Sequence, residues 1–177
     1  MIPKDRYMKR IAKFQKVSFR RFQEDWEALL FAKIQADIRA IYQDIRLPQR
    51  ATSGSAGYDF YAPVEIALQP GESIWIPTGV RVQMDEGWVL TCYPRSGLGF
   101  RYRLQLDNTV GVIDSDYFYS DNEGHIQAKL TNDSREGKRL VIPAGKAFMQ
   151  GIFLEYGITV DDAAQGVRNG GLGSTGL

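Results

Sequence analysis

The distribution of glycine divides this chain into two unlike parts and limits what each part can fold into. All 18 glycines lie at or after Gly54, and no proline occurs between Pro3 and Pro48. Glycine and proline interrupt helices and mark turns, so a segment without them can form regular helical structure. The glycine-punctuated body that follows favours short strands joined by turns.

The glycine-free head contains apolar residues at helical spacing. They recur three or four positions apart and therefore lie on one stripe of a predicted helix: Phe22, Trp26, Leu30, Ile34, Ile38, Ile41 and Ile45. Residues 12–19 alternate loosely and are compatible with a strand. A stripe of this kind packs on the body or on another subunit more often than it binds a cofactor.

The body contains short apolar runs separated by turn signals. The expected strands are residues 74–76, 80–84, 89–93, 126–130 and 147–156. Many short strands without a long helical pattern predict an all-β sandwich or barrel, here with an added N-terminal helical segment. A length of 177 residues fits one domain. We divide it into a strand-and-helix extension (1–45), a β domain (46–165) and a flexible glycine-rich arm (166–177).

Charge and composition restrict the partners of the chain. Hydrophobic residues make up 44% and charged residues 24%, as in a folded globular protein. Residues 1–21 hold eight Lys or Arg and one acid. Such a basic arm either contacts an anionic surface or is a solvated face beside acidic neighbours, and the second is commoner, so we expect no specific nucleic-acid binding. No apolar run reaches 18 residues and no secretory signal is evident, so we expect a cytoplasmic protein.

Two residues of chemical interest stand alone. The single cysteine, Cys92, lies in an apolar run and is expected to be a buried structural residue. The single histidine, His125, is either a proton donor near a substrate or the first residue of a strand with local hydrogen bonds. We expect the second.

Four segments are too polar or too glycine-rich for ordinary strands: residues 55–60, 94–99, 108–117 and 168–176. Arginines, hydroxyl groups and glycines in these segments suit phosphate oxygens. Their aspartates are able to orient an attacking water or to hold Mg²⁺ through waters. Each segment alone is more often an ordinary turn or tail, and the prediction of a nucleotide site depends on their joint occurrence.

Together and in this order, the four segments resemble four of the five motifs of the trimeric deoxyuridine triphosphatases (dUTPases). The fifth would be residues 145–151. The resemblance covers about residues 46–177, and the long head is similar to that of a bacterial subgroup. It implies a β-barrel or jelly-roll fold and a homotrimer with shared active sites. It also implies Mg²⁺-dependent hydrolysis of dUTP to dUMP and pyrophosphate, which limits uracil in DNA and supplies dUMP for thymidylate synthesis.

The resemblance also implies a role for each matching residue. Asp114 would activate the water that attacks the α-phosphorus, and Asp59 would support the metal through water. The expected contacts with the base and sugar are Asn108, Gly111, Val112, Ile113, Tyr117 and Gln127, with the Tyr117 ring excluding a 2′-hydroxyl. The expected contacts with the phosphates, including those of the closing arm, are Arg95, Ser96, Gly97, Gln150, Arg168, Gly173, Ser174 and Thr175, and Leu172 of the same arm would cover the uracil.

The chain departs from the family pattern at three places. Leu172 replaces an aromatic residue that stacks on uracil, so we expect weaker closure of the arm. Ala147 and Met149 replace an Arg and an Ala, and the loop after Tyr117 is longer than usual. Two alternatives remain open at this point: an enzyme similar to dCTP deaminases, and a nucleotide-sensing relative without turnover.

Overall fold

The computed structural model describes residues 8–30 and 36–171. The strands in these ranges are β1 Ala12–Lys16, β2 Gln49–Arg50, β3 Tyr58–Tyr61, β4 Ile66–Leu68, β5 Ser73–Pro77, β6 Val80–Met84, β7 Trp88–Pro94, β8 Leu104–Leu106, β9 Gly111–Ile113, β10 Gln127–Asn132, β11 Leu140–Ile142 and β12 Ala147–Glu155. The helices are α1 Phe19–Leu29, α2 Ile38–Asp44, α3 Ser96–Tyr102 and the short 3-10 helix η1 Ser115–Tyr119. The expected all-β class with an N-terminal helical segment is confirmed.

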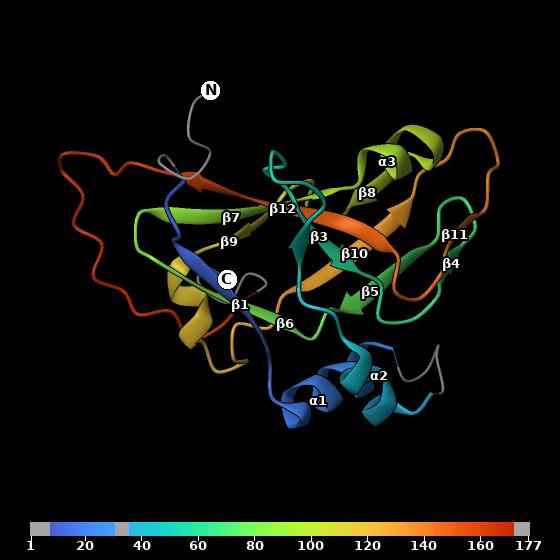
Figure 1. Ribbon diagram of the computed structural model, residues 1–177, viewed down its shortest axis with the longest axis horizontal. Coiled ribbons are helices and arrows are strands. Elements are labelled where there is room, and N and C mark those ends of the chain that lie inside the picture. The colour runs from blue at the N-terminus through green and yellow to red at the C-terminus, as the bar shows by residue number, and fades with distance from the viewer. Residues whose placement is uncertain (1–7, 31–35, 172–177) are drawn as a thin grey trace.

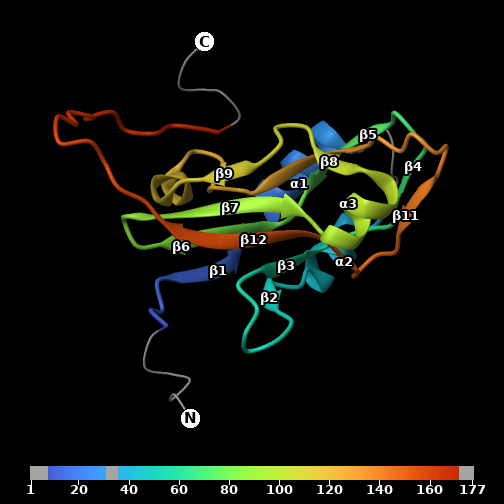
Figure 2. The same cartoon turned by 90° about the horizontal axis from the view of Figure 1, so that it is seen from above.

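Antiparallel ladders join the strands into four small sheets within the described residues (Figure 1). The largest has the order β2-β3-β12-β7-β9, and the others are β5-β10-β8, β1-β6 and β11-β4. Seen from above, β12 lies between β7 and β3 (Figure 2). The expected strands around residues 74–76, 80–84, 89–93, 126–130 and 147–156 all form, as β5, β6, β7, β10 and β12.

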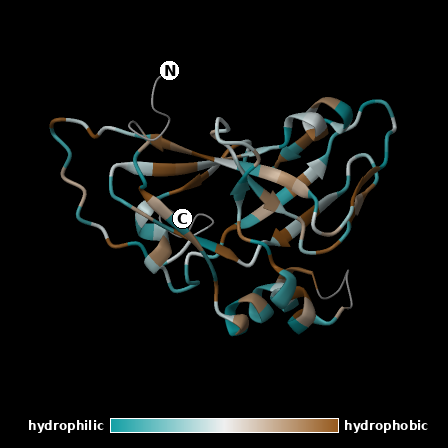
Figure 3. Ribbon diagram, viewed as in Figure 1, coloured by the Kyte–Doolittle hydropathy of each residue, from teal (hydrophilic) through white to brown (hydrophobic). Residues whose placement is uncertain are grey.

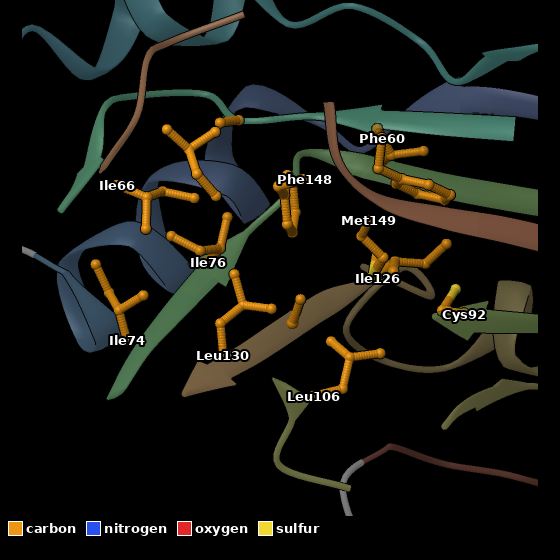
Figure 4. Close-up of a cluster of buried hydrophobic side chains, with 14 of the residues drawn as sticks. Phe60, Ile66, Ile74, Ile76, Cys92, Leu106, Ile126, Leu130, Phe148 and Met149 are labelled. Atoms are coloured by element: carbon orange, nitrogen blue, oxygen red, sulfur yellow. The ribbon is translucent and has the colours of Figure 1, made fainter. Parts of the chain in front are cut away.

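The core lies between these sheets and draws side chains from most of them (Figure 4). Its completely buried members include Phe60 of β3, Ile76 of β5, Leu130 of β10 and Phe148 of β12. Residues of β10 alternate between the core and the other face of the strand, because Ala128 and Leu130 are buried and Lys129 between them is less so.

The head forms two helices, and the prediction of one continuous helix from Phe22 to Ile45 is wrong. Helix α1 ends at Leu29, and α2 begins at Ile38, where the Asp37 carboxylate caps the backbone N–H groups of Arg39 and Ala40. The apolar spacing continues across the break because both helices face the same body. Ile34 of the expected stripe lies outside the described residues.

The head is built into the body rather than attached to its surface. Strand β1 pairs with β6 in antiparallel register, Phe14 opposite Val82. The Phe14 ring packs against Phe60 of β3 at a centroid distance of 5.7 Å. Helix α1 then buries Phe22 and Trp26 completely, and both helices carry hydrophilic as well as hydrophobic segments (Figure 3).

Gly79 shows how closely the head approaches the body. This residue connects β5 to β6 with φ of 72°, a conformation that glycine adopts without strain. A Cβ atom at this position would collide with the Ile45 side chain and lie 3.3 Å from the Phe22 ring. The turn between the two strands therefore needs glycine for its backbone angle and for the space that the head occupies.

Across residues 8–30 and 36–171, no helix has the length and apolarity that a bilayer crossing requires.

Candidate active site

A cavity of about 400 Å³ opens between β7, β9, β10 and η1. Six of the residues expected to contact the base or sugar line it: Asn108, Gly111, Val112, Ile113, Tyr117 and Gln127. Its volume is in the range of small-molecule sites. The structure therefore brings together, around one concave surface, residues that are up to 19 positions apart in the chain.

The segment that precedes the cavity wall has an unusual backbone. Thr109 has φ of 64°, and its N–H donates to the carbonyl of Leu106 at 2.8 Å. Within the described ladders, β8 pairs with β10 and β9 pairs with β7, so the turn between them connects two different sheets.

The proposed catalytic carboxylate lies at the edge of this cavity. Asp114 directly follows the lining residue Ile113 and precedes η1, and its side chain is 43% exposed. Its Oδ2 atom forms an ion pair with Nη2 of Arg168, and Nε of Arg168 donates to Oδ1 of Asp116 at 2.9 Å. Arg168 also lines the cavity. The chain after β12 thus returns to η1, as the loop beyond β12 in Figure 1 shows.

Tyr117 forms a wall of the cavity and is 7% exposed. Its hydroxyl donates to the carbonyl of His125 at 2.9 Å and accepts from Nδ2 of Asn122 at 2.8 Å. Burial is the largest influence on this phenol and raises its pKa. The hydroxyl is therefore occupied by protein partners, and the ring is what the residue offers to the cavity.

The other expected phosphate and metal residues form a second cluster. Arg95 makes an ion pair with Asp59 of β3, and Gln150 of β12 lies opposite Asp59 in the ladder. A Cβ atom at Gly57 would lie 2.6 Å from Oε1 of Gln150. Ser96 and Gly97 start helix α3, where the sequence indicated a loop. All residues of this second cluster are described by the structure, and none of them lines the cavity.

The remaining expected site residues cannot be placed against the cavity. Leu172, Gly173, Ser174 and Thr175 lie outside the described residues. Gly171, just before them, lines the cavity next to the Tyr117 ring.

Several lining residues are ones that sequence reasoning did not select, notably Trp75, Asp107 and Lys129. Nζ of Lys129 pairs with Oδ2 of Asp107 at 2.9 Å and lies 5.8 Å from the centre of the Trp75 ring. Burial opposes ionisation of Asp107, but hydrogen bonds from Thr131 and Lys129 outweigh it and lower its pKa. The alternation of β10 could have identified Lys129 as a lining residue, because Lys129 lies two positions after Gln127 and on the same face of the strand.

The expectation for Cys92 is confirmed and that for His125 is wrong. Cys92 is 2% exposed, and burial raises the pKa of its thiol to about 12. The His125 ring is completely buried, but its hydrogen bonds are not local. Nδ1 meets Oδ2 of Asp25 at 2.5 Å, and Nε2 accepts from the N–H of Gly79 at 2.8 Å.

Comparisons with known proteins agree on one family. The dUTPase family model matches residues 43–176. A deoxyuridine 5'-triphosphate nucleotidohydrolase of Lactococcus lactis is 42% identical over 135 residues, which are 75% of this chain and 89% of that protein. One of Dictyoglomus turgidum is 38% identical over 156 residues, covering 81% and 99%.

Solved structures show the same likeness. The dUTPase of Streptococcus mutans superimposes with a TM-score of 0.61 and 31% identity, covering 84% of this chain and 98% of that one. A dUTPase of phage phi11 of S. aureus shares the fold, with a TM-score of 0.59 and 17% identity over 88% of this chain and 97% of the phage chain.

Proposed function

The chain belongs to the dUTPase family, and on that premise we propose that it hydrolyses dUTP to dUMP and pyrophosphate. The observation that carries the proposal is the cavity whose wall contains Asn108, Gly111–Ile113 and Tyr117, with Asp114 at its edge. This reaction would limit uracil in DNA and supply dUMP for thymidylate synthesis. The family match favours it over the deaminase alternative.

We assign recognition of the base to the segment between β8 and β9 and to β9 itself. Asn108 and Gly111–Ile113 line the cavity, and the Asn108 amide together with the backbone groups of Gly111–Ile113 would meet the edge of a pyrimidine. Gly111 is closely enclosed, because a Cβ atom there would lie 3.1 Å from Cβ of Cys92. A tight wall of this kind supports selection of uracil over the larger thymine.

The chemical step requires an ionised carboxylate within reach of a water molecule. Asp114 takes the proton of the water whose oxygen forms a bond to the α-phosphorus. The bond from that phosphorus to the bridging oxygen breaks, and pyrophosphate leaves. Arg168 neutralises Asp114 before the substrate arrives. A triphosphate competes for the same guanidinium, because phosphate oxygens accept from arginine in the same bidentate way as carboxylates.

The cluster around Arg95 supports a site shared between subunits. Arg95, Ser96, Gly97 and Gln150 are suited to phosphate oxygens, and they lie apart from the cavity lining of their own chain. In a homotrimer, this cluster would serve the cavity of a neighbouring copy. We propose this assembly, in which Arg168 and Gly171 of the arm line the cavity.

The residues fit an indirect role in holding Mg²⁺. Among residues 8–30 and 36–171, no group of three or more His, Cys, Asp or Glu is arranged to hold a metal ion. Mg²⁺ in nucleotide sites is held mostly by phosphates and waters with one or two carboxylates. Asp59 would supply one such carboxylate from beside Arg95, in the cluster that we assign to the phosphates. When bound, the ion would neutralise phosphate charge, and the phage phi11 protein coordinates a structural Mg(II) ion.

The domain division of the sequence is part of the same proposal. The family model begins at residue 43, which supports reading residues 1–45 as an addition to a β domain of residues 46–165 and an arm of residues 166–177. We also keep a cytoplasmic location, without specific nucleic-acid binding, as an expectation for an enzyme whose substrate is a free nucleotide.

One experiment tests the function directly. Pyrophosphate release, ammonia release and nucleotide binding are measured with dUTP, dCTP, dTTP and UTP in parallel, with Mg²⁺ present. We expect release from dUTP alone. Ammonia release from dCTP would indicate a deaminase, and binding of dUTP without release would indicate a nucleotide sensor.

A further inference from the structure

The head reaches the candidate site through a buried side chain of α1. Asp25 is 8% exposed, and its Oδ2 atom meets Nδ1 of the buried His125 ring at 2.5 Å. Because Nε2 of the same ring accepts the N–H of Gly79, the ring proton is on Nδ1 and is donated to Asp25. Arg21, one turn earlier, compensates the carboxylate charge with Nη2 at 2.6 Å from Oδ1. The histidine is therefore a neutral ring fixed at both nitrogens.

The backbone carbonyl of the fixed His125 in turn restrains the Tyr117 side chain. The Tyr117 hydroxyl donates to the His125 carbonyl, and Asn122 donates to the hydroxyl. Ordered bonds on both sides of the oxygen leave the ring little freedom to tilt. The route from α1 to the cavity wall thus consists of the hydrogen bond between Asp25 and the His125 ring, His125 itself, and the hydrogen bond from Tyr117 to the His125 carbonyl.

A second head contact holds the segment between Tyr117 and His125. Ser18 donates its backbone N–H to Oε2 of Glu123 at 2.7 Å and its hydroxyl to Oε1 at 2.6 Å. The Ser18 hydroxyl also caps α1 through the N–H of Arg21. Gly124 follows with φ of 65°, and a Cβ atom there would lie 2.6 Å from the Tyr117 carbonyl oxygen. The head therefore contacts this segment at Glu123 and at His125, both near its C-terminal end.

The Tyr117 ring in turn supports the returning arm. A Cβ atom at Gly171 would lie 2.6 Å from Cε2 of Tyr117. The guanidinium carbon of Arg168 lies 5.9 Å from the ring centre. A displaced ring would change the cavity wall and the surface on which the arm lies.

We propose that Asp25 and His125 are positioning residues for the sugar end of the dUTP site, and that through them the N-terminal head sets the selectivity for deoxyribose over ribose. The inference rests on the proposed function, because it takes the Tyr117 ring as the surface that meets the sugar. A pair that merely docks α1 would affect stability and leave selectivity unchanged.

The test measures kcat and KM for dUTP and UTP in full-length variants. Asp25→Ala removes the acceptor for the His125 N–H, and we expect the ratio of kcat/KM for dUTP to that for UTP to fall roughly tenfold. Asp25→Asn keeps an acceptor oxygen in the same place and should restore most of the ratio. Glu27→Ala is the matched control, since Glu27 is an exposed residue of the same helix whose side chain bonds to Gln23 and not to Arg21. It should leave the ratio unchanged.

Tyr117→Phe tests the positioning role even if the Asp25→Ala protein does not fold, because this substitution removes one hydroxyl and leaves the head intact. We expect it to lower the ratio to a similar extent, and Asp25→Ala should add nothing further in that background. An unchanged ratio in Tyr117→Phe, or in folded Asp25→Ala, overturns the inference. A wild-type protein without dUTP turnover overturns the proposed function and this inference with it, so the two failures are distinguishable.

Discussion

The guanidinium group of Arg168 forms an ion pair with the carboxylate of Asp114, 54 residues earlier in the chain. The same guanidinium donates to Asp116, so it spans the two acids at the start of η1. The guanidinium occupies Oδ2 of the proposed base, where a phosphate of the substrate would compete for it. The arm is therefore placed to respond when a competing anion enters the cavity.

Asp114→Asn should abolish turnover and preserve nucleotide binding. The amide keeps the shape of the carboxylate and loses its ability to take a proton, so we expect kcat to fall by about 10²–10⁴-fold. Pyrophosphate release measures turnover, and calorimetric titration with a non-hydrolysable dUTP analogue measures binding. Asp116→Asn is the matched control and should have a small effect. Near-normal activity of Asp114→Asn would refute the assignment of the base.

Arg168→Lys should impair the enzyme although it keeps the positive charge. Lysine lacks the planar fork with which Arg168 contacts two carboxylates, and it lacks the bidentate fit to phosphate. We expect kcat/KM for dUTP to fall roughly tenfold, the order of one lost charge-assisted hydrogen bond. Arg135→Lys, in an exposed turn, serves as the control. Equal effects of the two substitutions would contradict a specific role for the guanidinium.

Cys92 should not react with thiol reagents in the native protein. The side chain is 2% exposed, and burial raises its pKa to about 12, so thiolate is scarce at neutral pH. A disulfide-exchange reagent should titrate no thiol under native conditions and one thiol after denaturation. Rapid native labelling would show that the cavity wall beside Gly111 opens in solution.

The strands of the body were predictable because each depends on its own residues. Alternation gives β5, β6 and β10, and the flanking glycine turns set their ends. Alternation in β10 also placed Gln127 on the face that lines the cavity. The motif segments indicated which residues surround a nucleotide, although the helical start of α3 and the separation of β8 from β9 into two sheets depend on tertiary contacts.

The role of the head was not predictable because it depends on pairs far apart in the sequence. Asp25 and His125 are 100 positions apart, and an isolated aspartate on a helix gives no sign of a partner. Removal of residues 1–21 would take away β1 and the Ser18 contacts with Glu123, and neither contribution can be read from the sequence of the head alone.

The docking of the head should weaken in acid. Burial opposes ionisation of Asp25, but hydrogen bonds from His125 and Arg21 outweigh it, so its pKa lies below its usual value. A lowered pKa in the folded state contributes stability above the unfolded pKa of about 3.9, and this is lost as the pH falls through the folded value. Thermal melting from pH 7 to pH 2 should show a smaller acid-dependent loss in Asp25→Asn than in wild type. Parallel profiles would contradict the contribution of Asp25.

Removing residues 167–177 should lower turnover strongly and leave the folded domain intact. The truncation removes Arg168 from Asp114 and Gly171 from the Tyr117 ring, whereas the last strand, β12, ends at Glu155. We expect kcat/KM for dUTP to fall by about 10²-fold, because closure of such an arm excludes water and completes the site. Circular dichroism, melting temperature and the mass in solution should match those of the full chain. A changed mass would show that the arm holds subunits together, and retained turnover would show that Arg168 is not needed for catalysis.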